Sequence, residues 1–264
     1  MFQQLPRPTK TYHTKPYPAI SPSRPELSLK GKTVLITAGG KQDGYVHFLR
    51  SPYSHATSTG IGLAITNAVA QAGASTIVLF ARREQPLLDA KTAIESKFPS
   101  TKVETYTGSL TSSEDIARVL AATGNIDILV LSAGRSHNPG PTASIPIADL
   151  KADFDTNVIG TMDFVQQFVA LPSEKARTII HVSTAGAYLE GMGVAGYGAS
   201  KLATSHLIRN IAAEAKGIRA FTFHPAVAFT EFSEQMGYPG EDQFEYDDSK
   251  SCHLLDIEAG EGEC

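Results

Sequence analysis

Two residues four positions apart, Tyr197 and Lys201, form a pair whose types and spacing suit proton transfer. A spacing of four residues places both side chains on one face of a helix. A phenol and an amine both titrate, so each can hold or release a proton. Two hydroxyl residues, Ser183 and Thr184, precede Tyr197 by fourteen and thirteen positions, and Asn157 lies farther upstream. These five polar residues are the first candidates for a catalytic centre.

A set of glycines forms a second chemical signal. Gly39 follows an apolar run, and Gly60 and Gly62 open a helical pattern. Glycines at such a turn let the backbone approach a pyrophosphate at a helix N-terminus, where free N–H groups and the helix dipole favour an anion. An insert of seventeen residues, 41–57, separates the two halves of this motif and has no helix or strand period. We predict that the insert is either a surface loop or translated intron sequence.

The elements that must position these residues alternate between strands and helices. Short apolar, β-branched runs predict six strands, at residues 33–37, 75–80, 103–107, 126–132, 177–183 and 218–223. Apolar residues at helical spacing predict five helices, at residues 59–72, 85–98, 112–122, 149–171 and 197–215. Such alternation requires right-handed crossovers and a parallel sheet covered on both faces. We therefore predict an α/β fold, a Rossmann-type doubly wound parallel sheet in a single domain, with ligands at the carboxyl ends of the strands.

In their order and spacing, these motifs resemble the classical short-chain dehydrogenase/reductase family over about residues 31–232. The resemblance also rests on a turn similar to the N-A-G motif of the family, at Ser132, Ala133 and Gly134, and on a segment ending at Thr230. Residues 1–30 look like a fungal subgroup often found in secondary metabolism.

The resemblance implies a mechanism for the polar residues. Tyr197 is implied to be the general acid in reduction and the base in oxidation, with Lys201 lowering the pKa of its phenol and holding the nicotinamide ribose. Either Ser183 or Thr184 is implied to donate a hydrogen bond to the substrate oxygen. The family spacing favours Thr184, and the family residue type favours Ser183. Asn157 is implied to anchor a water that links Lys201 to solvent.

The resemblance also implies a nicotinamide dinucleotide as cofactor. Arg82 and Arg83 follow the second strand, where an acidic residue would bind the ribose hydroxyls of NAD, so we predict NADP(H). Val227 and Thr230 are implied to hold the carboxamide. The residues implied to bind the cofactor are Thr37, Gly39, Gly60, Ile61, Gly62, Arg82, Arg83, Ala133, Gly134, Asn157, Tyr197, Lys201, Val227 and Thr230.

Proline and charge divide the chain into three regions. Six of the fifteen prolines lie in residues 1–30, which predicts an extended arm rather than a helix. Residues 31–232 form the predicted catalytic domain. Residues 233–264 form an acidic tail: from Glu231 onward the chain has eleven acidic residues and one basic residue. The family normally adds a seventh strand in this region, and the tail shows no strand period, so we predict that this strand is absent.

Composition excludes several classes of protein. Hydrophobic residues are 42% and charged residues 19% of the 264, which is ordinary for a soluble globular protein. No apolar stretch reaches the roughly 18 residues of a membrane span, the N-terminus has no signal-peptide core, and no metal-binding spacing occurs. Both cysteines lie in the tail, and the basic residues are scattered rather than gathered as a nucleic-acid site requires. We predict a cytoplasmic protein with a small-molecule partner and no metal, nucleic acid or membrane partner; a homo-oligomer is compatible with the sequence.

Two functions from different classes follow. The first is an NADP(H)-dependent oxidoreductase that interconverts a ketone and a secondary alcohol on a small organic or secondary-metabolite substrate. The alternative is a catalytically impaired homologue, truncated or mis-spliced, that acts only as a binding protein. Tyr197, Lys201 and Asn157 favour the first, and the split glycine motif and missing strand favour the second. Binding of NADPH discriminates between them.

Overall fold

Six parallel strands form one sheet in the computed structural model, which describes residues 18–38 and 60–225. The strands are β1 (Thr33–Thr37), β2 (Thr76–Ala81), β3 (Lys102–Thr107), β4 (Ile128–Leu131), β5 (Arg177–Val182) and β6 (Ile218–Phe223). Their order across the sheet is β3-β2-β1-β4-β5-β6. Strands β2 and β3 are therefore added on one side of β1, and β4, β5 and β6 on the other side. This reversal of strand order makes the carboxyl ends of β1 and β4 a topological switch point.

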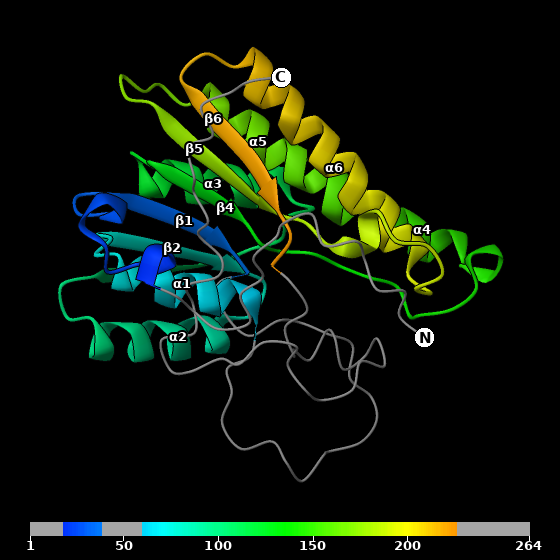
Figure 1. Ribbon diagram of the computed structural model, residues 1–264, viewed down its shortest axis with the longest axis horizontal. Coiled ribbons are helices and arrows are strands. Elements are labelled where there is room, and N and C mark those ends of the chain that lie inside the picture. Colours follow the sequence, from blue (N-terminus) through cyan, green and yellow to red (C-terminus); the bar gives the residue numbers. More distant parts are fainter. Residues whose placement is uncertain (1–17, 39–59, 226–264) are drawn as a thin grey trace, which may run out of the picture.

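Helices cover both faces of this sheet. They are α1 (Ile61–Gln71), α2 (Glu84–Lys97), α3 (Ser113–Thr123), α4 (Ile147–Phe154), α5 (Thr161–Ala170) and α6 (Ala195–Glu214). Helices α1 and α2 pack on one face, and α3, α5 and α6 pack on the other (Figure 1). The predicted doubly wound parallel sheet is confirmed. Within the described residues, no helix is long and apolar enough to cross a membrane.

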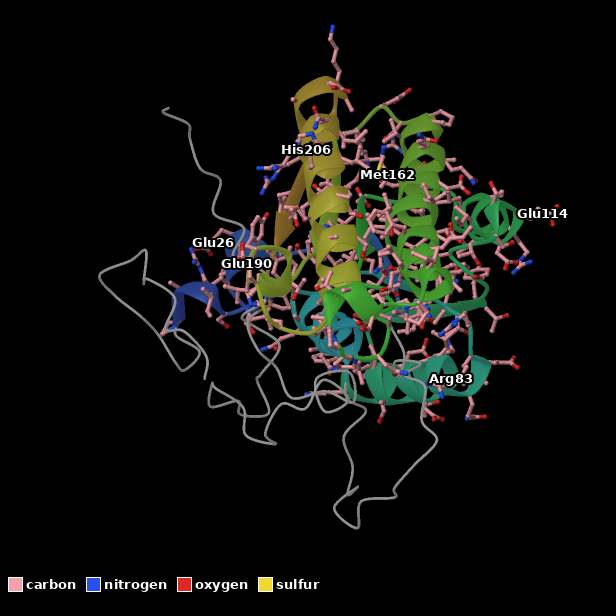
Figure 2. All side chains as sticks on the ribbon, turned by 90° about the vertical axis from the view of Figure 1, so that its right-hand side faces the viewer. Glu26, Arg83, Glu114, Met162, Glu190 and His206 are labelled. Carbon is pink, nitrogen blue, oxygen red and sulfur yellow. The ribbon has the colours of Figure 1, made fainter. Side chains whose placement is uncertain are left out.

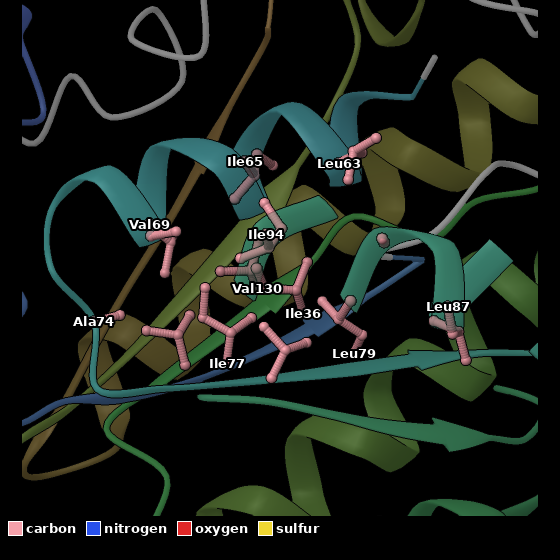
Figure 3. Packing of buried hydrophobic residues seen from close by; sticks show 14 of the residues in the cluster. Ile36, Leu63, Ile65, Val69, Ala74, Ile77, Leu79, Leu87, Ile94 and Val130 are labelled. Carbon is pink, nitrogen blue, oxygen red and sulfur yellow. The ribbon is translucent and has the colours of Figure 1, made fainter. Parts of the chain in front are cut away.

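The sheet is buried by two apolar clusters, one on each face. Figure 3 shows the cluster between the sheet and helices α1 and α2, which includes Ile36, Ile65, Val69, Ile77, Leu79, Leu87, Ile94 and Val130. In the cluster on the opposite face, the rings of Phe80 and Phe164 meet edge to face with centroids 5.7 Å apart. Burial on both faces explains why the strands read as continuous apolar runs in the sequence.

The single helix expected over residues 149–171 is interrupted in the structure. Helix α4 ends at Phe154, a π-helical turn spans Asp155–Gly160, and α5 follows. A Cβ atom on Gly160 would lie only 2.2 Å from the main-chain oxygen of Leu110, so this close approach requires glycine. Such π turns are rare and often occur at functional sites. Asn157 lies in the turn and is buried.

Residues 18–30 differ from the extended arm that the prolines predicted. They contain two single-turn 3-10 helices, Pro18–Ile20 and Pro25–Leu27. Each turn begins at a proline, whose fixed φ suits the first position of a helical turn. Ile20 is buried, and Leu29 packs against the core beside α1, so this part of the arm is attached to the domain.

Several sequence-based predictions concern residues outside the described ranges. They are the predictions for residues 1–17, for Gly39, for the insert 41–57, for Val227 and Thr230, for the tail 233–264 and for the absence of a seventh strand.

Candidate active site

A cleft lies at the topological switch point, beside the N-terminus of α1. Its lining comes from the ends of β1, β4 and β5 and from the first turns of α1 and α6. The lining residues are Ala38, Gly60, Ile61, Gly62, Ser132, Gly134, Val182, Ser183, Tyr197 and Lys201. The structure therefore brings the described glycines of the split motif together with the tyrosine and lysine that lie more than a hundred residues later.

The first turn of α1 supplies backbone donors to this cleft. Gly60 precedes the helix in an extended conformation and, as a glycine, has no side chain that could cap it. Ala38, on the opposite side of the split motif, has a φ of 55°, in the left-handed region that residues with a Cβ rarely adopt. Exposed first-turn N–H groups and the helix dipole fit an anionic group such as a pyrophosphate.

Thr37 holds the turn that follows β4. Its side chain is buried, and Oγ1 accepts hydrogen bonds from the main-chain N–H groups of Ser132 and Ala133, each at 3.1 Å. Gly134 comes next, and a Cβ atom there would lie 3.2 Å from Nζ of Lys201. This turn therefore lies directly against the site lysine.

Lys201 is buried with its charge close to Tyr197. It is 3% exposed, and its Nζ donates to the main-chain oxygen of Val182 at 3.0 Å. The same atom lies 6.0 Å from the centre of the Tyr197 ring. Burial disfavours the charged amine and lowers the pKa of Lys201 to about 8.

Burial is the largest influence on the pKa of Tyr197. Burial raises the pKa of its phenol, because a phenolate loses hydration inside the protein. A hydrogen bond with Thr184 lowers this pKa and the charge of Asp153 raises it, but both are smaller than the effect of burial. That Lys201 lowers the pKa of Tyr197 stays a prediction.

The two hydroxyl residues at the end of β5 have different partners. Thr184 begins a short 3-10 helix, Ala185–Ala187, and its Oγ1 accepts from the N–H group of Gly186 at 3.2 Å. Ser183 Oγ instead lies 2.9 Å from Ser205 Oγ on α6. Of the two, Thr184 is the one that bonds to the side chain of Tyr197.

Asn157 fastens the π turn to the loop after β4. Its Nδ2 donates to the main-chain oxygen of Arg135 at 2.7 Å and to Ser200 Oγ at 2.8 Å, and its Oδ1 accepts from the Arg135 N–H group at 2.8 Å. These contacts place Asn157 behind the cleft wall. Its water-anchoring role stays a prediction.

The sequence analysis missed an ionic cluster beside this wall. Asp153 is fully buried; it pairs with Arg135 and accepts from Nδ1 of His137 at 2.6 Å. Arg135 also pairs with Asp149 at 2.8 Å. The His137 ring lies against Gly196, the residue before the site tyrosine. A signal was present in the sequence. Asp149 and Asp153 are four residues apart and so share one helix face, and the basic residues Arg135 and His137 lie twelve or more residues before them.

The two arginines that suggested NADP(H) lie at the end of β2, apart from the residues that line the cleft. Arg83 is the residue immediately before α2, and both side chains are exposed. Figure 2 labels Arg83 on the surface at the start of that helix. This is the position in a doubly wound fold at which the adenosine ribose is read.

His181 and His224 have protein partners. His181 is buried with Nδ1 3.2 Å from Thr222 Oγ1, and Nδ1 of His224 accepts from the N–H group of Ala185 at 3.2 Å. In the ranges 18–38 and 60–225, no group of three or more histidine, cysteine or acidic residues could hold a metal ion.

Comparisons with known proteins agree with this arrangement. A family model described as short chain dehydrogenase matches residues 56–238. A short chain dehydrogenase/reductase of Aspergillus aculeatus is 34% identical over 87% of this chain and 75% of the relative. One from Claviceps purpurea is 35% identical over 92% of this chain and 78% of the relative.

The fold of this chain is also similar to that of a solved structure. The NADPH-dependent 3-quinuclidinone reductase of Rhodotorula rubra matches with a TM-score of 0.65 and 21% identity, over 86% of this chain and 79% of that one.

Proposed function

This chain belongs to the short-chain dehydrogenase/reductase family, and from that premise we propose that it is an NADP(H)-dependent oxidoreductase that interconverts a ketone and a secondary alcohol. One observation carries the proposal. Tyr197, hydrogen-bonded to Thr184, and the buried Lys201 lie in one cleft with the first turn of α1. That cleft therefore combines a proton donor, a fixed cation and backbone donors for an anion.

The proton step follows from the protonation of Tyr197. Because burial raises its pKa, the phenol keeps its proton at neutral pH and is ready to act as a general acid. Reduced NADPH, when bound, supplies the hydride that the carbonyl carbon accepts. As charge develops on the carbonyl oxygen, Tyr197 gives its proton to that oxygen.

The residues for the cofactor fit its chemistry. The first-turn N–H groups at Gly60, Ile61 and Gly62 suit the pyrophosphate, and Lys201 would hold the nicotinamide ribose. Arg82 and Arg83 would bind the 2′-phosphate through charge-assisted hydrogen bonds. Thr37, Ala133 and Gly134 contribute by shaping the turn after β4.

We assign the substrate to the small ketones of fungal secondary metabolism and the protein to the cytoplasm. The relatives from Aspergillus and Claviceps support the fungal part of this assignment, as does the N-terminal region, which looks like a fungal subgroup of the family.

Replacement of Tyr197 by Phe tests the proposed reaction. We expect NADPH consumption with phenanthrenequinone, an activated diketone, to fall about a hundredfold or more, because the transferable proton is lost. NADPH affinity, measured by fluorescence titration, should change less than about threefold. Tyr106→Phe on β3 is the matched control and should retain turnover. If the wild-type protein binds NADPH but reduces no carbonyl, the impaired binding protein is the correct function.

Replacement of Arg82 and Arg83 by Ala tests the choice of cofactor. The double variant should lose about 2 kcal/mol of NADPH binding, because two charge-assisted contacts to the phosphate disappear. Affinity for NADH should hardly change. Lys97→Ala, at the other end of α2, is the control for a general loss of charge. Equal losses for NADPH and NADH would show that this turn does not read the phosphate.

A further inference from the structure

A row of polar side chains runs from the cleft into the interior. Ser183 Oγ lies 2.9 Å from Ser205 Oγ, which lies 3.3 Å from Thr222 Oγ1, which lies 3.2 Å from Nδ1 of His181. Ser205 also donates to the main-chain oxygen of Lys201 at 2.8 Å. Ser183, Ser205 and His181 are all buried. The row joins α6 to the ends of β5 and β6 directly behind the site.

The protons in this row have a single consistent arrangement. A carbonyl oxygen can only accept, so the single hydroxyl proton of Ser205 is donated to the main-chain oxygen of Lys201. Ser205 must then accept from both Ser183 and Thr222. The proton of Thr222 is used in that contact, so His181 Nδ1 must donate to Thr222. Every contact is satisfied only in this direction.

The state of His181 agrees with this direction. Burial lowers its pKa well below the ordinary value, and the nearby charge of Lys201 lowers it further, so the ring is neutral and has one N–H group. Its Nε2 is buried and has no hydrogen-bond partner in the part of the chain that the structure describes. A lone pair is tolerated in such a place better than an N–H donor, which favours the proton on Nδ1.

Thr184 is free of this row. Its Oγ1 accepts from the N–H group of Gly186, which leaves its own proton available. It is hydrogen-bonded to the side chain of Tyr197. The hydroxyl of Thr184 therefore lies beside the reacting group with its proton unused by the row, whereas the proton of Ser183 points into the protein.

We propose that Ser205, Thr222 and His181 are positioning residues that commit the proton of Ser183 to the interior. Ser183 then faces the cleft only as an acceptor, which leaves Thr184, the position that the family spacing already favours, as the hydroxyl that donates to the substrate oxygen. The donor role of Thr184 rests on the proposed function, but the direction of the row does not.

The direction of the row can be measured without any turnover. Nitrogen-15 NMR of the unmodified protein, with side-chain through-bond assignment, reports which ring nitrogen of His181 is protonated. We expect a neutral His181 with its proton on Nδ1 from pH 6 to pH 8. A proton on Nε2, or a charged ring in this range, would overturn the proposal, because Thr222 would then donate to His181 or the row would be broken.

Kinetics with NADPH and phenanthrenequinone test the two hydroxyls. Thr184→Val should lower kcat about a hundredfold or more, as expected for loss of a donor to a developing oxyanion, and Thr184→Ser should restore kcat to within about fivefold of wild type. Ser183→Ala should lower kcat by less than about tenfold. A larger loss in Ser183→Ala than in Thr184→Val would overturn the proposal.

The two tests separate the proposals from each other. Melting curves show whether each variant is folded before its kinetics are compared. If the wild-type protein shows no NADPH turnover at all, the proposed function fails, while the His181 spectrum still decides the direction of the row.

Discussion

Lys201 and Tyr197 have opposite responses to the same buried environment. Burial favours the neutral form of each side chain, so it lowers the pKa of the amine and raises the pKa of the phenol. At neutral pH the pair therefore consists of a charged lysine and an uncharged tyrosine. This combination suits donation of a proton by Tyr197 and electrostatic binding by Lys201.

The pKa of Lys201 has a consequence for stability. In the folded protein it is about 8, against 10.5 for an ordinary lysine, so the unfolded chain binds more protons between these pH values. The burial of charged Lys201 therefore costs stability below pH 8, and the cost disappears as pH rises towards 10.5.

Replacement of Lys201 by Met should expose this cost. We expect the variant to be more stable than wild type by up to about 3 kcal/mol at pH 7, with an advantage that shrinks steadily above pH 8. Urea unfolding at several pH values between 7 and 10 measures the difference. Lys175→Met, at an exposed lysine, is the control and should show no such trend. A pH-independent difference for Lys201→Met would contradict the assigned pKa.

At the scale of elements, the position of the catalytic pair depends on how closely α6 approaches the turn after β5. A Cβ atom on Gly198 would lie 2.2 Å from the main-chain oxygen of Gly186. The neighbouring atom belongs to the backbone, so it cannot rotate away as a flexible side chain would. The glycine inside the Tyr197–Lys201 spacing is therefore needed for Tyr197 to reach Thr184.

Replacement of Gly198 by Ala should move the helix. We expect a loss of about 1–3 kcal/mol in unfolding free energy, as for other overpacked sites, and a marked loss of kcat because Tyr197 is displaced from Thr184. Thermal melting and NADPH consumption with phenanthrenequinone measure the two effects. Ala199→Ser, one residue further at an exposed position, is the control. Unchanged kcat in Gly198→Ala would show that the approach can relax without disturbing the site.

At the scale of the whole molecule, the sheet order decides where the cleft lies. Ala38, after β1, and Gly60, before α1, line the cleft at the switch point between β1 and β4, although residues 39–59 separate them along the chain. The chain thus leaves the cleft and returns to it across the insert. The entropy of closing a loop grows slowly with its length, so an insert between two such ends is tolerated.

Deletion of residues 41–57 tests this account of the insert. The shortened chain should bind NADPH with equal or higher affinity, because the closing cost of a long loop is removed and the glycines meet directly. Fluorescence titration of both proteins with NADPH makes the comparison. Loss of binding on deletion would mean that the insert itself contacts the cofactor.

Much of the fold was readable from local patterns. The apolar runs predicted β1 and β6 with the bounds that the structure has, and the other strands to within two residues at each end. Helical spacing located α1, α2, α3 and α6, because each buries one apolar stripe against the sheet. The spacing of apolar residues could not predict the π turn at Asp155–Gly160. Gly160, at its end, lies against the main chain of Leu110, and this contact comes from a segment far away in the sequence.

For the candidate site too, the sequence predicted some features and only the tertiary structure showed others. Residue type and spacing predicted the pairing of Tyr197 with Lys201, and the family resemblance built on them implied Ser183 or Thr184 as the hydroxyl. Only the tertiary structure showed that Ser183 bonds to Ser205 and that Thr184 bonds to Tyr197. The physical reason is that a hydrogen-bond direction and a pKa depend on burial and on partners far apart in the chain, whereas a sequence motif records only which groups are present.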